Sequence, residues 1–184
     1  MRGVPSNLAR RAAETGSADR CVSNAGRTRK AAPRRKGVSA RECVILVGLP
    51  GAGKSTFVRS RFPDYTHISK DALPRHARDK QARQDAAIRA ALSAGRPVVV
   101  DNTNVTAADR AAIIAIAREF GVRVVGYYLE VTTREAVARN ERREGRERVP
   151  KVAIFTSAKK LVPPQVSEGF DELFTVTGEP QTEP

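Results

Sequence analysis

Short apolar runs alternate along this chain with longer polar or amphipathic stretches. The run Cys43–Val47 stops at Gly48, and the run Val98–Val100 stops at Asp101. Continuous apolar runs of this length are typical of strands buried on both faces of a parallel sheet. Because such strands alternate with helical stretches of about a dozen residues, the pattern predicts an α/β fold with a mostly parallel sheet.

The predicted elements form one domain over residues 41–178, followed by a tail at 179–184. Helices are expected to stop at Pro63, Gly95 and Gly121. Thr106 is expected to cap one helix, and Thr132 or Thr133 the next. Strands are expected over residues 43–47, 65–69, 98–100, 122–129 and 174–176, and helices over 54–61, 79–94, 106–120, 132–143 and 150–161.

The net charge of +13 is concentrated at the start of the chain. Residues 1–40 carry ten Lys and Arg against Glu14 and Asp19, a net +8 that leaves +5 for the rest. With little apolar periodicity, this segment is predicted to be a disordered basic arm. It would attach non-specifically to nucleic-acid phosphates, or serve as a solvated leader, which the composition favours. It also loosely resembles an organelle transit peptide.

The cysteines and the apolar stretches bear on the cellular setting. Cys21 and Cys43 show no metal or disulfide spacing. Cys43 heads an apolar run and is expected to be a buried small hydrophobe. No stretch approaches the roughly 18 apolar residues that a membrane span needs, and the basic arm has no apolar core of a secretory signal. We therefore expect a reducing, cytoplasmic setting with no membrane and no disulfide partner.

The stretch from Gly48 to Thr56 matches the phosphate-loop pattern G-x-x-x-x-G-K-[ST] in full. It follows a predicted buried strand and opens a predicted helix, as this motif requires. Glycines let backbone N–H groups close around phosphates at a helix N-terminus, where the partial positive charge favours anions. The predicted nucleoside-triphosphate site consists of Gly48, Pro50, Gly51, Ala52, Gly53, Lys54, Ser55 and Thr56.

Residue types in and near this loop favour ATP with Mg²⁺. Lys54 is expected to reach the β- and γ-phosphates, and the Ser55 hydroxyl to ligate the metal. Asp101, directly after an apolar strand, stands where a Walker-B-type acid would help to hold the same ion. ATP is favoured over GTP because no N-K-x-D element follows.

Polar residues that follow two other strands are candidates for binding the phosphoryl acceptor. Ligands gather outside the carboxyl ends of the strands in an open parallel sheet. Asp71 and the run Asp101, Asn102, Thr103 and Asn104 are therefore expected to meet near the phosphate loop. A carboxylate at Asp71 can accept a proton from an acceptor hydroxyl, although Asp also caps turns.

Other side chains near Asp71 leave alternatives open. His67 is a rival base, but its place inside a predicted strand favours a structural role. Arg75, His76 and Arg78 add phosphate-binding potential beside Asp71, or else belong to a solvated loop.

A dense run of arginines lies between Arg134 and Arg148, interleaved with glutamates. One interpretation is a helix with pairs four residues apart, such as Glu135–Arg139 and Glu144–Arg148. The favoured interpretation is a mobile lid whose arginines stabilise charge on the transferring phosphoryl group. Its candidate ATP-binding side chains are Arg139, Arg142 and Arg143.

With these residues in place, the chain from about Glu42 to Val176 resembles the kinase domain of the polynucleotide 5′-kinases, the phage and animal end-healing enzymes. The resemblance follows the chain in order. It includes the G-x-P-G-x-G-K-S-T loop, the strand that ends in Ile68-Ser69-Lys70-Asp71, and Asp101-Asn102-Thr103-Asn104 as the D-N-T-N element. Arg139-Asn140 followed by Arg142-Arg143 is similar to the lid pattern R-N-x-x-R, and Val149-Pro150, Pro163 and Glu168-Gly169-Phe170 are similar to the tail of the animal members.

The resemblance implies a central parallel sheet of four to five strands and transfer of the ATP γ-phosphate to a 5′-hydroxyl end of DNA or RNA. It implies Asp71 as the general base, Arg143 as the lid arginine and Asp101 as an anchor of the acceptor site, with Lys54 also catalytic. The phage pattern has Arg three residues after the base, where this sequence has Pro74, so that Arg75 stands one position further on. The phosphatase motif D-x-D-x-T does not occur in these 184 residues, so we expect phosphate addition alone.

Two other functions remain open at this point. One is a small-molecule kinase on the same fold, acting on a sugar, a nucleoside or an antibiotic. The other is a nucleic-acid-binding ATPase module that uses ATP as a switch and depends on the basic arm.

Overall fold

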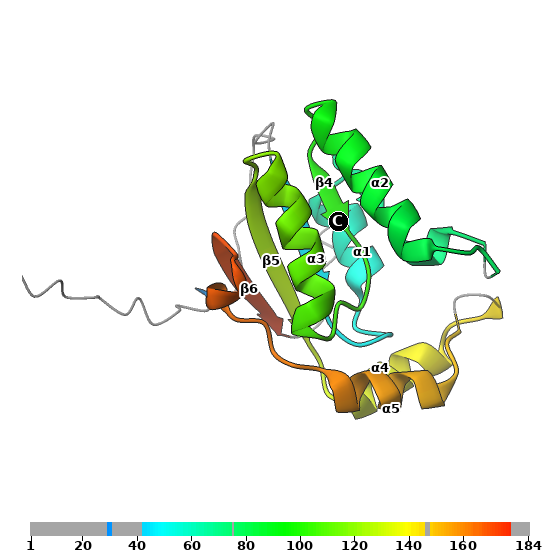
Figure 1. Ribbon diagram of the computed structural model, residues 1–184. Helices are drawn as coiled ribbons and strands as arrows, with labels where there is room; N and C mark the ends of the chain where they lie inside the picture. Colours follow the sequence, from blue (N-terminus) through cyan, green and yellow to red (C-terminus); the bar gives the residue numbers. More distant parts are fainter. Residues whose placement is uncertain (1–28, 31–41, 75, 146–147, 178–184) are drawn as a thin grey trace, which may run out of the picture.

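Figure 1 shows the computed structural model of the chain, a parallel sheet with helices on both faces. The structure describes residues 29–30, 42–74, 76–145 and 148–177. Its strands are β1 (Arg29–Lys30), β2 (Glu42–Val47), β3 (Thr66–Ile68), β4 (Val98–Val100), β5 (Arg123–Glu130) and β6 (Glu172–Thr177). Its helices are α1 (Lys54–Arg61), α2 (Lys80–Ser93), α3 (Ala107–Glu119), α4 (Thr133–Glu141) and α5 (Lys151–Lys160), with one-turn helices η1 (Lys70–Ala72) and η3 (Val166–Glu168).

The strands lie in the order β1-β6-β5-β2-β4-β3, and each neighbouring pair is parallel. Five of them come from residues 42–177, as the sequence predicts, and the two-residue β1 adds a sixth at the edge beside β6. Ile45 and Ile68 both pair with Val100. Because of this register, the chain segments that follow β2, β3 and β4 all start at the carboxyl ends of the strands, on one side of the sheet.

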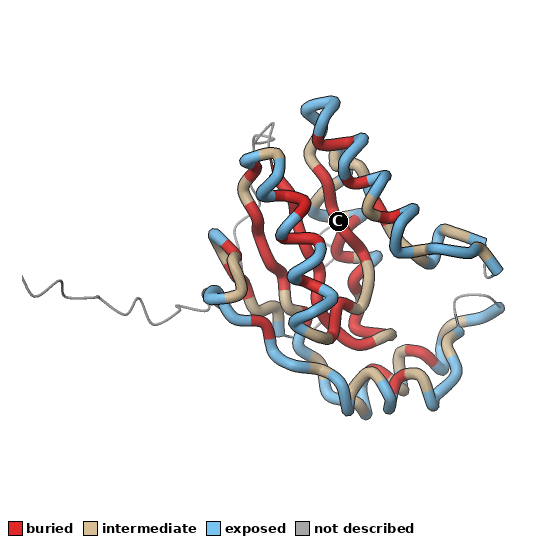
Figure 2. Tube along the Cα trace, in the orientation of Figure 1, coloured by how far each residue is buried: buried red, intermediate tan, exposed pale blue. Residues whose placement is uncertain are grey.

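The central strand β2 explains the two apolar cores. Its residues alternate between faces because the side-chain period of a strand is two. Cys43, Ile45 and Val47 pack into the core beneath α2 and α3. Val44 and Leu46 pack into the core on the opposite face, together with Phe57 and Val58 of α1. Every residue of β2 is buried, and buried residues run along the centre of the sheet in Figure 2. The uninterrupted apolar run in the sequence therefore reflects burial on both faces.

Two helix starts are capped as predicted. Thr106 accepts a hydrogen bond from the backbone N–H of Asp109 at 3.1 Å, and Thr132 accepts one from Glu135 at 3.2 Å. In both cases the acidic side chain bonds back to the capping residue, which forms a capping box. The C-terminal end of the fourth helix differs from the prediction, because α4 ends at Glu141 and Arg142 is its C-cap. Glu144 therefore lies outside the helix, and the predicted helical pair Glu144–Arg148 is wrong.

Helices α4 and α5 form a hairpin near the carboxyl ends of the strands, on the side of the sheet where the phosphate loop lies (Figure 1). Ala136 of α4 and Ile154 of α5 are fully buried and share a small core with Leu49 of the phosphate loop. This third core fixes the base of the hairpin against the loop.

The predicted basic arm lies outside the described residues except for Arg29–Lys30, which form β1 instead of remaining disordered. Cys43 is fully buried, as predicted, and burial raises the pKa of its thiol to about 12. Within the part of the chain that the structure describes, no helix is long and apolar enough to cross a membrane.

Candidate active site

The phosphate loop connects β2 to α1. Gly53 has a φ of 91°, a left-handed conformation that favours glycine, and it is the N-cap of α1. The first turn of α1 contains no acidic residue, so the positive end of the helix is free to attract a phosphate. Lys54 follows directly and is 8% exposed. Its Nζ donates hydrogen bonds to the carbonyl oxygens of Gly48 at 3.0 Å and Leu49 at 2.8 Å.

The predicted metal ligands Ser55 and Asp101 are in direct contact. The Ser55 hydroxyl donates to Asp101 Oδ2 at 2.7 Å, although the two residues are 46 positions apart. The same carboxylate oxygen lies 3.0 Å from His67 Nε2. Asp101 is 5% exposed, so its two partners hold a nearly buried carboxylate in one orientation. The ring of His67 thus contacts Asp101, and the structural role favoured for His67 stays a prediction.

The donor set at this point fits Mg²⁺. Mg²⁺ prefers oxygen ligands and is usually held by one or two side chains together with water and substrate phosphates. Ser55 and Asp101 provide two oxygens 2.7 Å apart beside the phosphate loop. Among the described residues, no group of three or more His, Cys, Asp or Glu side chains could hold a metal by itself. Two protein oxygens beside a phosphate loop suit an ion whose other ligands are water and substrate phosphates.

The loop from Asp101 to Asn104 is joined to both neighbouring strands. The backbone N–H of Asp101 donates to Ile68 O at 2.8 Å, and the N–H of Gly48 donates to Thr103 O at 3.0 Å. Asn104 is 4% exposed, has a φ of 44°, and donates from Nδ2 to Leu46 O at 2.7 Å. The side chain of Asn104 therefore ties the loop to β2, whereas acceptor contacts by Asn102 and Thr103 stay a prediction.

Asp71 lies in η1, the short helix that follows β3, and is exposed. Its backbone N–H donates to Ser69 Oγ at 3.2 Å. The electrostatics of Lys54 place Asp71 in the same site. Burial lowers the pKa of Lys54 to about 8, the charges of Asp101 and Asp71 oppose this shift, and the charge of Arg143 adds to it. The predicted base and the predicted lid arginine thus both act on the phosphate-loop lysine.

The arginines of the α4 region differ in how they meet the phosphate loop. Arg139 donates from Nη1 to Ala52 O at 3.4 Å, and Arg143 is close enough to affect Lys54. Arg142 is exposed. Asn140 between them is 1% exposed and pairs with both backbone groups of Val149, at 2.7 and 2.9 Å. This amide closes the loop that carries Arg143.

Gly51 explains how closely the hairpin approaches the loop. A Cβ atom on Gly51 would lie 2.5 Å from the carbonyl oxygen of Ala136, and the residue has a φ of 88°. Only glycine suits both conditions without a shift of the backbone. The loop and α4 are therefore in close backbone contact, which brings Arg139 within reach of Ala52 O.

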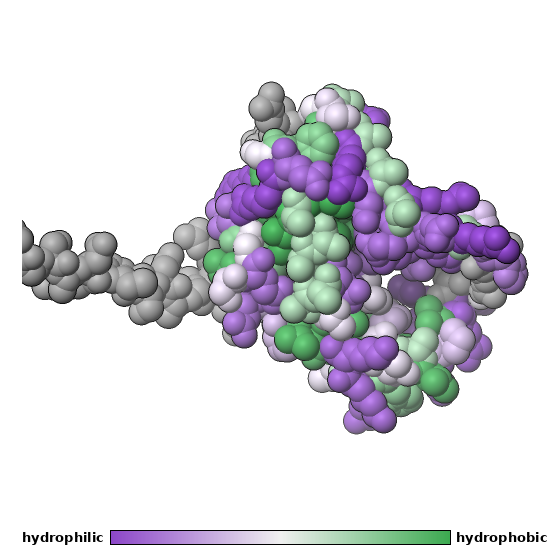
Figure 3. Space-filling model, viewed as in Figure 1, coloured by the Kyte–Doolittle hydropathy of each residue, from purple (hydrophilic) through white to green (hydrophobic). Residues whose placement is uncertain are grey.

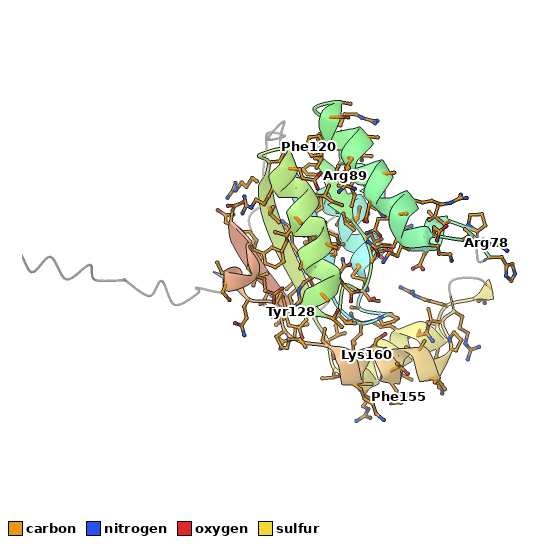
Figure 4. The ribbon with its side chains drawn as sticks, viewed as in Figure 1. Arg78, Arg89, Phe120, Tyr128, Phe155 and Lys160 are labelled. Atoms are coloured by element: carbon orange, nitrogen blue, oxygen red, sulfur yellow. The ribbon has the colours of Figure 1, made fainter. Side chains whose placement is uncertain are left out.

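The surface is hollowed between this hairpin and the segment that leads into α2 (Figure 3). Arg78 lies at the outer end of that segment, and Phe155 of α5 lies on the far side of the hairpin, away from the hollow (Figure 4). His76 and Arg78 are exposed. Arg75, the other predicted acceptor contact in this segment, lies outside the described residues.

Two buried polar residues near the site were not predicted. Arg110 of α3 is fully buried, and Gln84 of α2 is 3% exposed. Both leave a signal in the sequence, because each occupies a core-facing position of its helix. Arg110 is in register with Ile113, Ile114 and Ala117, and Gln84 is in register with Ile88, Ala91 and Leu92. A polar residue in an apolar stripe indicates a buried hydrogen-bonding role.

Comparison with known proteins identifies the family. The family model described as AAA domain, AAA_33, matches residues 43–164. The chain belongs to the AAA_33 family. The matched region begins in β2 and ends just after α5. It contains the phosphate loop, Asp71, the run Asp101–Asn104 and the hairpin of α4 and α5.

Two curated relatives are each 33% identical to this chain. A candidate bifunctional polynucleotide phosphatase/kinase of Acanthamoeba polyphaga mimivirus aligns over 153 residues, 79% of this chain and 34% of that protein. The bifunctional polynucleotide phosphatase/kinase of Schizosaccharomyces pombe aligns over 134 residues, 70% of this chain and 32% of that protein. The predicted resemblance to the polynucleotide kinases is thereby confirmed. The chain spans about a third of the length of these relatives.

Solved structures confirm the fold class. The crystal structure of Chaetomium thermophilum Kti12 in complex with ADP-AlF3 matches with a TM-score of 0.59 and 19% identity, over 76% of this chain and 91% of that one. At this identity the likeness shows the fold alone, an α/β phosphate-loop fold with a parallel sheet flanked by helices.

Proposed function

We propose that this chain is an ATP-dependent polynucleotide 5′-hydroxyl kinase. The observation that carries the proposal is the cluster at the phosphate loop. Ser55 donates to Asp101 at 2.7 Å, Arg139 donates to Ala52 O at 3.4 Å, and the charges of Asp71 and Arg143 act on Lys54. An exposed carboxylate, a metal-binding acid and a lid arginine around one phosphate-loop lysine are the parts that phosphoryl transfer requires. The named activity of the two relatives supports a polynucleotide 5′ end as the acceptor.

The reaction needs a proton acceptor and a charge clamp. The carboxylate of Asp71 takes the proton of the 5′-hydroxyl while that oxygen bonds to the γ-phosphorus, and the bond from the γ-phosphorus to the bridging oxygen of ADP breaks. Lys54, Arg139 and Arg143 neutralise the charge that develops on the phosphoryl oxygens. Ser55 and Asp101 would hold Mg²⁺, which would neutralise part of the charge on the phosphate oxygens.

Replacing Asp71 with asparagine is expected to lower phosphate transfer by about 10²- to 10⁴-fold, because the amide cannot accept the hydroxyl proton. The measurement is transfer of label from γ-labelled ATP to an oligonucleotide with a 5′-hydroxyl, together with ATP affinity, which should stay near wild type. The matched control is Asp64→Asn, an exposed aspartate that precedes β3. Equal activity of the Asp71→Asn and Asp64→Asn variants would remove Asp71 from the mechanism.

The affinity for ATP is expected to fall as pH rises through about 8, the pKa of Lys54 in the free protein. Triphosphate charge favours the ammonium form and raises this pKa in the complex. Binding is therefore strongest below the free pKa, where Lys54 is already protonated. Above it, binding weakens by up to about tenfold per pH unit, because a proton must be taken up.

Calorimetry in two buffers of different ionisation enthalpy measures this proton uptake directly. We expect uptake of up to one proton just above the free pKa of Lys54. The Lys54→Met variant should bind more weakly and lose the pH dependence. A wild-type affinity that is flat across this range would show that Lys54 does not meet the phosphates.

A small-molecule kinase is the rival, because the fold alone does not select the acceptor. The salt dependence of acceptor binding distinguishes the polynucleotide kinase from the small-molecule kinase. On a single-stranded oligonucleotide, log acceptor affinity should fall against log salt concentration with a slope of about −0.7 per phosphate contact. Weak salt dependence, or turnover of a neutral sugar or nucleoside with no label on the oligonucleotide, would favour the rival. Deleting residues 1–40 distinguishes the kinase from the nucleic-acid-binding ATPase module. A kinase keeps catalysis without this segment, whereas the module should lose most of its function.

A further inference from the structure

A chain of amide groups connects the buried side of α2 to the helical turn that carries Asp71. Gln84 accepts a hydrogen bond at Oε1 from Asn102 Nδ2 at 2.5 Å. Asn102 in turn accepts at Oδ1 from the backbone N–H of Lys70 at 2.9 Å. Lys70 is the first residue of η1 and precedes Asp71 directly. Three elements that are separate in sequence, α2, the loop after β4 and η1, are thus connected through two side chains.

The orientation of each amide in this chain is determined by the next. The N–H of Lys70 is a donor, so Asn102 must present its oxygen there. The nitrogen of Asn102 then faces Gln84, which must present its own oxygen in turn. A flipped amide at either residue would bring two donors together. The Gln84 oxygen therefore sets the orientation in which Asn102 meets η1.

Asp71 depends on this tether more than other residues of the site do. It is exposed, and among the described residues no hydrogen bond holds its carboxylate. Its position is determined by the backbone of η1, a single turn of three residues. That turn is held at its start by the Ser69 cap and by the bond from Lys70 to Asn102.

The unsatisfied atom of Gln84 argues against a role in packing alone. Gln84 is 3% exposed, and its Nε2 has no hydrogen-bond partner within the described part of the chain. A buried donor without a partner is unfavourable, and a hydrocarbon side chain in this core-facing position would avoid it. The oxygen end of the amide, which Asn102 needs, accounts for a glutamine at this position.

We propose that Gln84 is a positioning residue, which holds Asn102 and through it the turn that presents Asp71 to the acceptor hydroxyl. The proposal rests on the proposed function in one respect, the role of Asp71 as the base. The tether itself is a property of the protein alone and has its own readout.

The first experiment replaces Gln84 with methionine, which has similar length and no strong acceptor. We expect kcat for phosphate transfer to fall by about 10- to 100-fold, the effect of a slightly misplaced catalytic group. ATP affinity and the acceptor KM should stay near wild type. Gln84→Glu keeps an oxygen facing Asn102 and is expected to restore most of kcat. A weaker ATP affinity and a higher acceptor KM, in parallel with the fall in kcat, would indicate a general structural defect and overturn the proposal.

The second experiment tests whether Gln84 acts through Asn102. In an Asn102→Ala background, Gln84→Met should have no further effect on kcat, because the link is already broken. If the fold-losses in kcat of the two single variants multiply in the double variant, the two residues act independently and the proposal is overturned. The urea midpoint of each variant is measured alongside, and a fall in kcat that follows a fall in stability would also count against it.

The third experiment needs no substrate. Hydrogen exchange of the Lys70 amide should be faster in Gln84→Met than in wild type by about tenfold or more, since the acceptor of that N–H is no longer held in place. If wild type transfers no label to a 5′-hydroxyl oligonucleotide, the proposed function fails. Faster exchange would then still support the tether, whereas unchanged exchange of Lys70 overturns it in either case.

Discussion

The Arg143→Ala variant is expected to transfer phosphate about 10³- to 10⁵-fold more slowly than wild type, the contribution of a well-placed arginine to phosphoryl transfer. Arg143 follows α4, past the helix end at Glu141 and the C-cap Arg142. Burial lowers the pKa of Lys54 and the charge of Arg143 adds to that shift, so the guanidinium acts on the phosphate-loop lysine. Removing it leaves the charge that develops in the transition state without one of its partners.

The measurement is single-turnover label transfer at saturating ATP, which separates the chemical step from binding. Arg134→Ala is the matched control, because Arg134 lies in α4, the helix that Arg143 follows, is exposed and carries the same charge. The control should stay near wild type. Arg142→Ala should show a smaller loss than Arg143→Ala, since Arg142 is exposed. If Arg143→Ala transfers phosphate as fast as Arg134→Ala, the hairpin supplies no catalytic arginine.

The strands and the phosphate loop were predictable because local signals agree there. Each buried strand ends where an apolar run meets a polar residue or glycine, as at Val47–Gly48 and Val100–Asp101. The predicted third strand, Val98–Val100, has the same bounds in the structure. Helix starts at Thr106 and Thr132 were equally clear, because a capping threonine with an acid three residues later satisfies the exposed N–H groups locally.

The end of α4 was not predictable from local propensity. Glu and Arg are good helix formers, and they continue past the point where the helix stops. The reason lies in Asn140, whose buried amide bonds to both backbone groups of Val149 and turns the chain back toward α5. A contact over nine residues has no periodic signature, so the charge pattern predicts a longer helix than the structure has.

The polar connections of the site were also beyond local reasoning. The link from Gln84 to Asn102 spans 18 positions, and the bond between Ser55 and Asp101 spans 46. The position after a parallel strand predicted Asp101–Asn104 as one polar cluster at the acceptor site. The structure shows different environments within that unit, because Asn104 is buried against β2 while Asn102 faces α2 and η1.

Replacing Arg110 with methionine is expected to destabilise the fold by about 3–5 kcal/mol, the effect of breaking a buried ion pair. Arg110 is fully buried, and its Nε and Nη2 donate to both oxygens of Glu168 at 2.6 and 2.7 Å. Its Nη1 donates to the carbonyl oxygens of Asn104, Val105 and Val162, at 3.0, 3.3 and 3.1 Å. The guanidinium therefore joins the end of the acceptor loop to the segment that leaves the α4–α5 hairpin.

The loss follows from what stays behind when the guanidinium is removed. The carboxylate of Glu168 is 16% exposed and has no other cation among the ion pairs of the described residues. The carbonyl groups of Asn104 and Val162 lose this donor at the same time, whereas Val105 O keeps the N–H of Val162. Unpaired buried acceptors are costly. Urea unfolding at neutral pH measures the change, with the slope of the transition checked for two-state behaviour.

The matched control is Arg118→Met on the same helix. Arg118 donates to Gly169 O and to Asp171 at 2.8 and 3.0 Å, so it bridges α3 to the same part of the chain as Arg110 does. Its side chain is 45% exposed, and an ion pair at such a position contributes only about 0–1 kcal/mol. The two variants remove the same group from the same helix and differ in burial.

A double variant separates the ion pair from the carbonyl contacts. In Arg110→Met with Glu168→Leu, no buried charge is left without a partner, so part of the lost stability should return. The carbonyl groups of Asn104 and Val162 remain without the guanidinium as donor, so the recovery should be incomplete. If Arg110→Met lowers the free energy of unfolding no more than Arg118→Met does, the guanidinium does not hold the loop after β4 to the segment that follows α5. Backbone contacts such as the 2.9 Å bond from Val162 N to Val105 O then join these two segments.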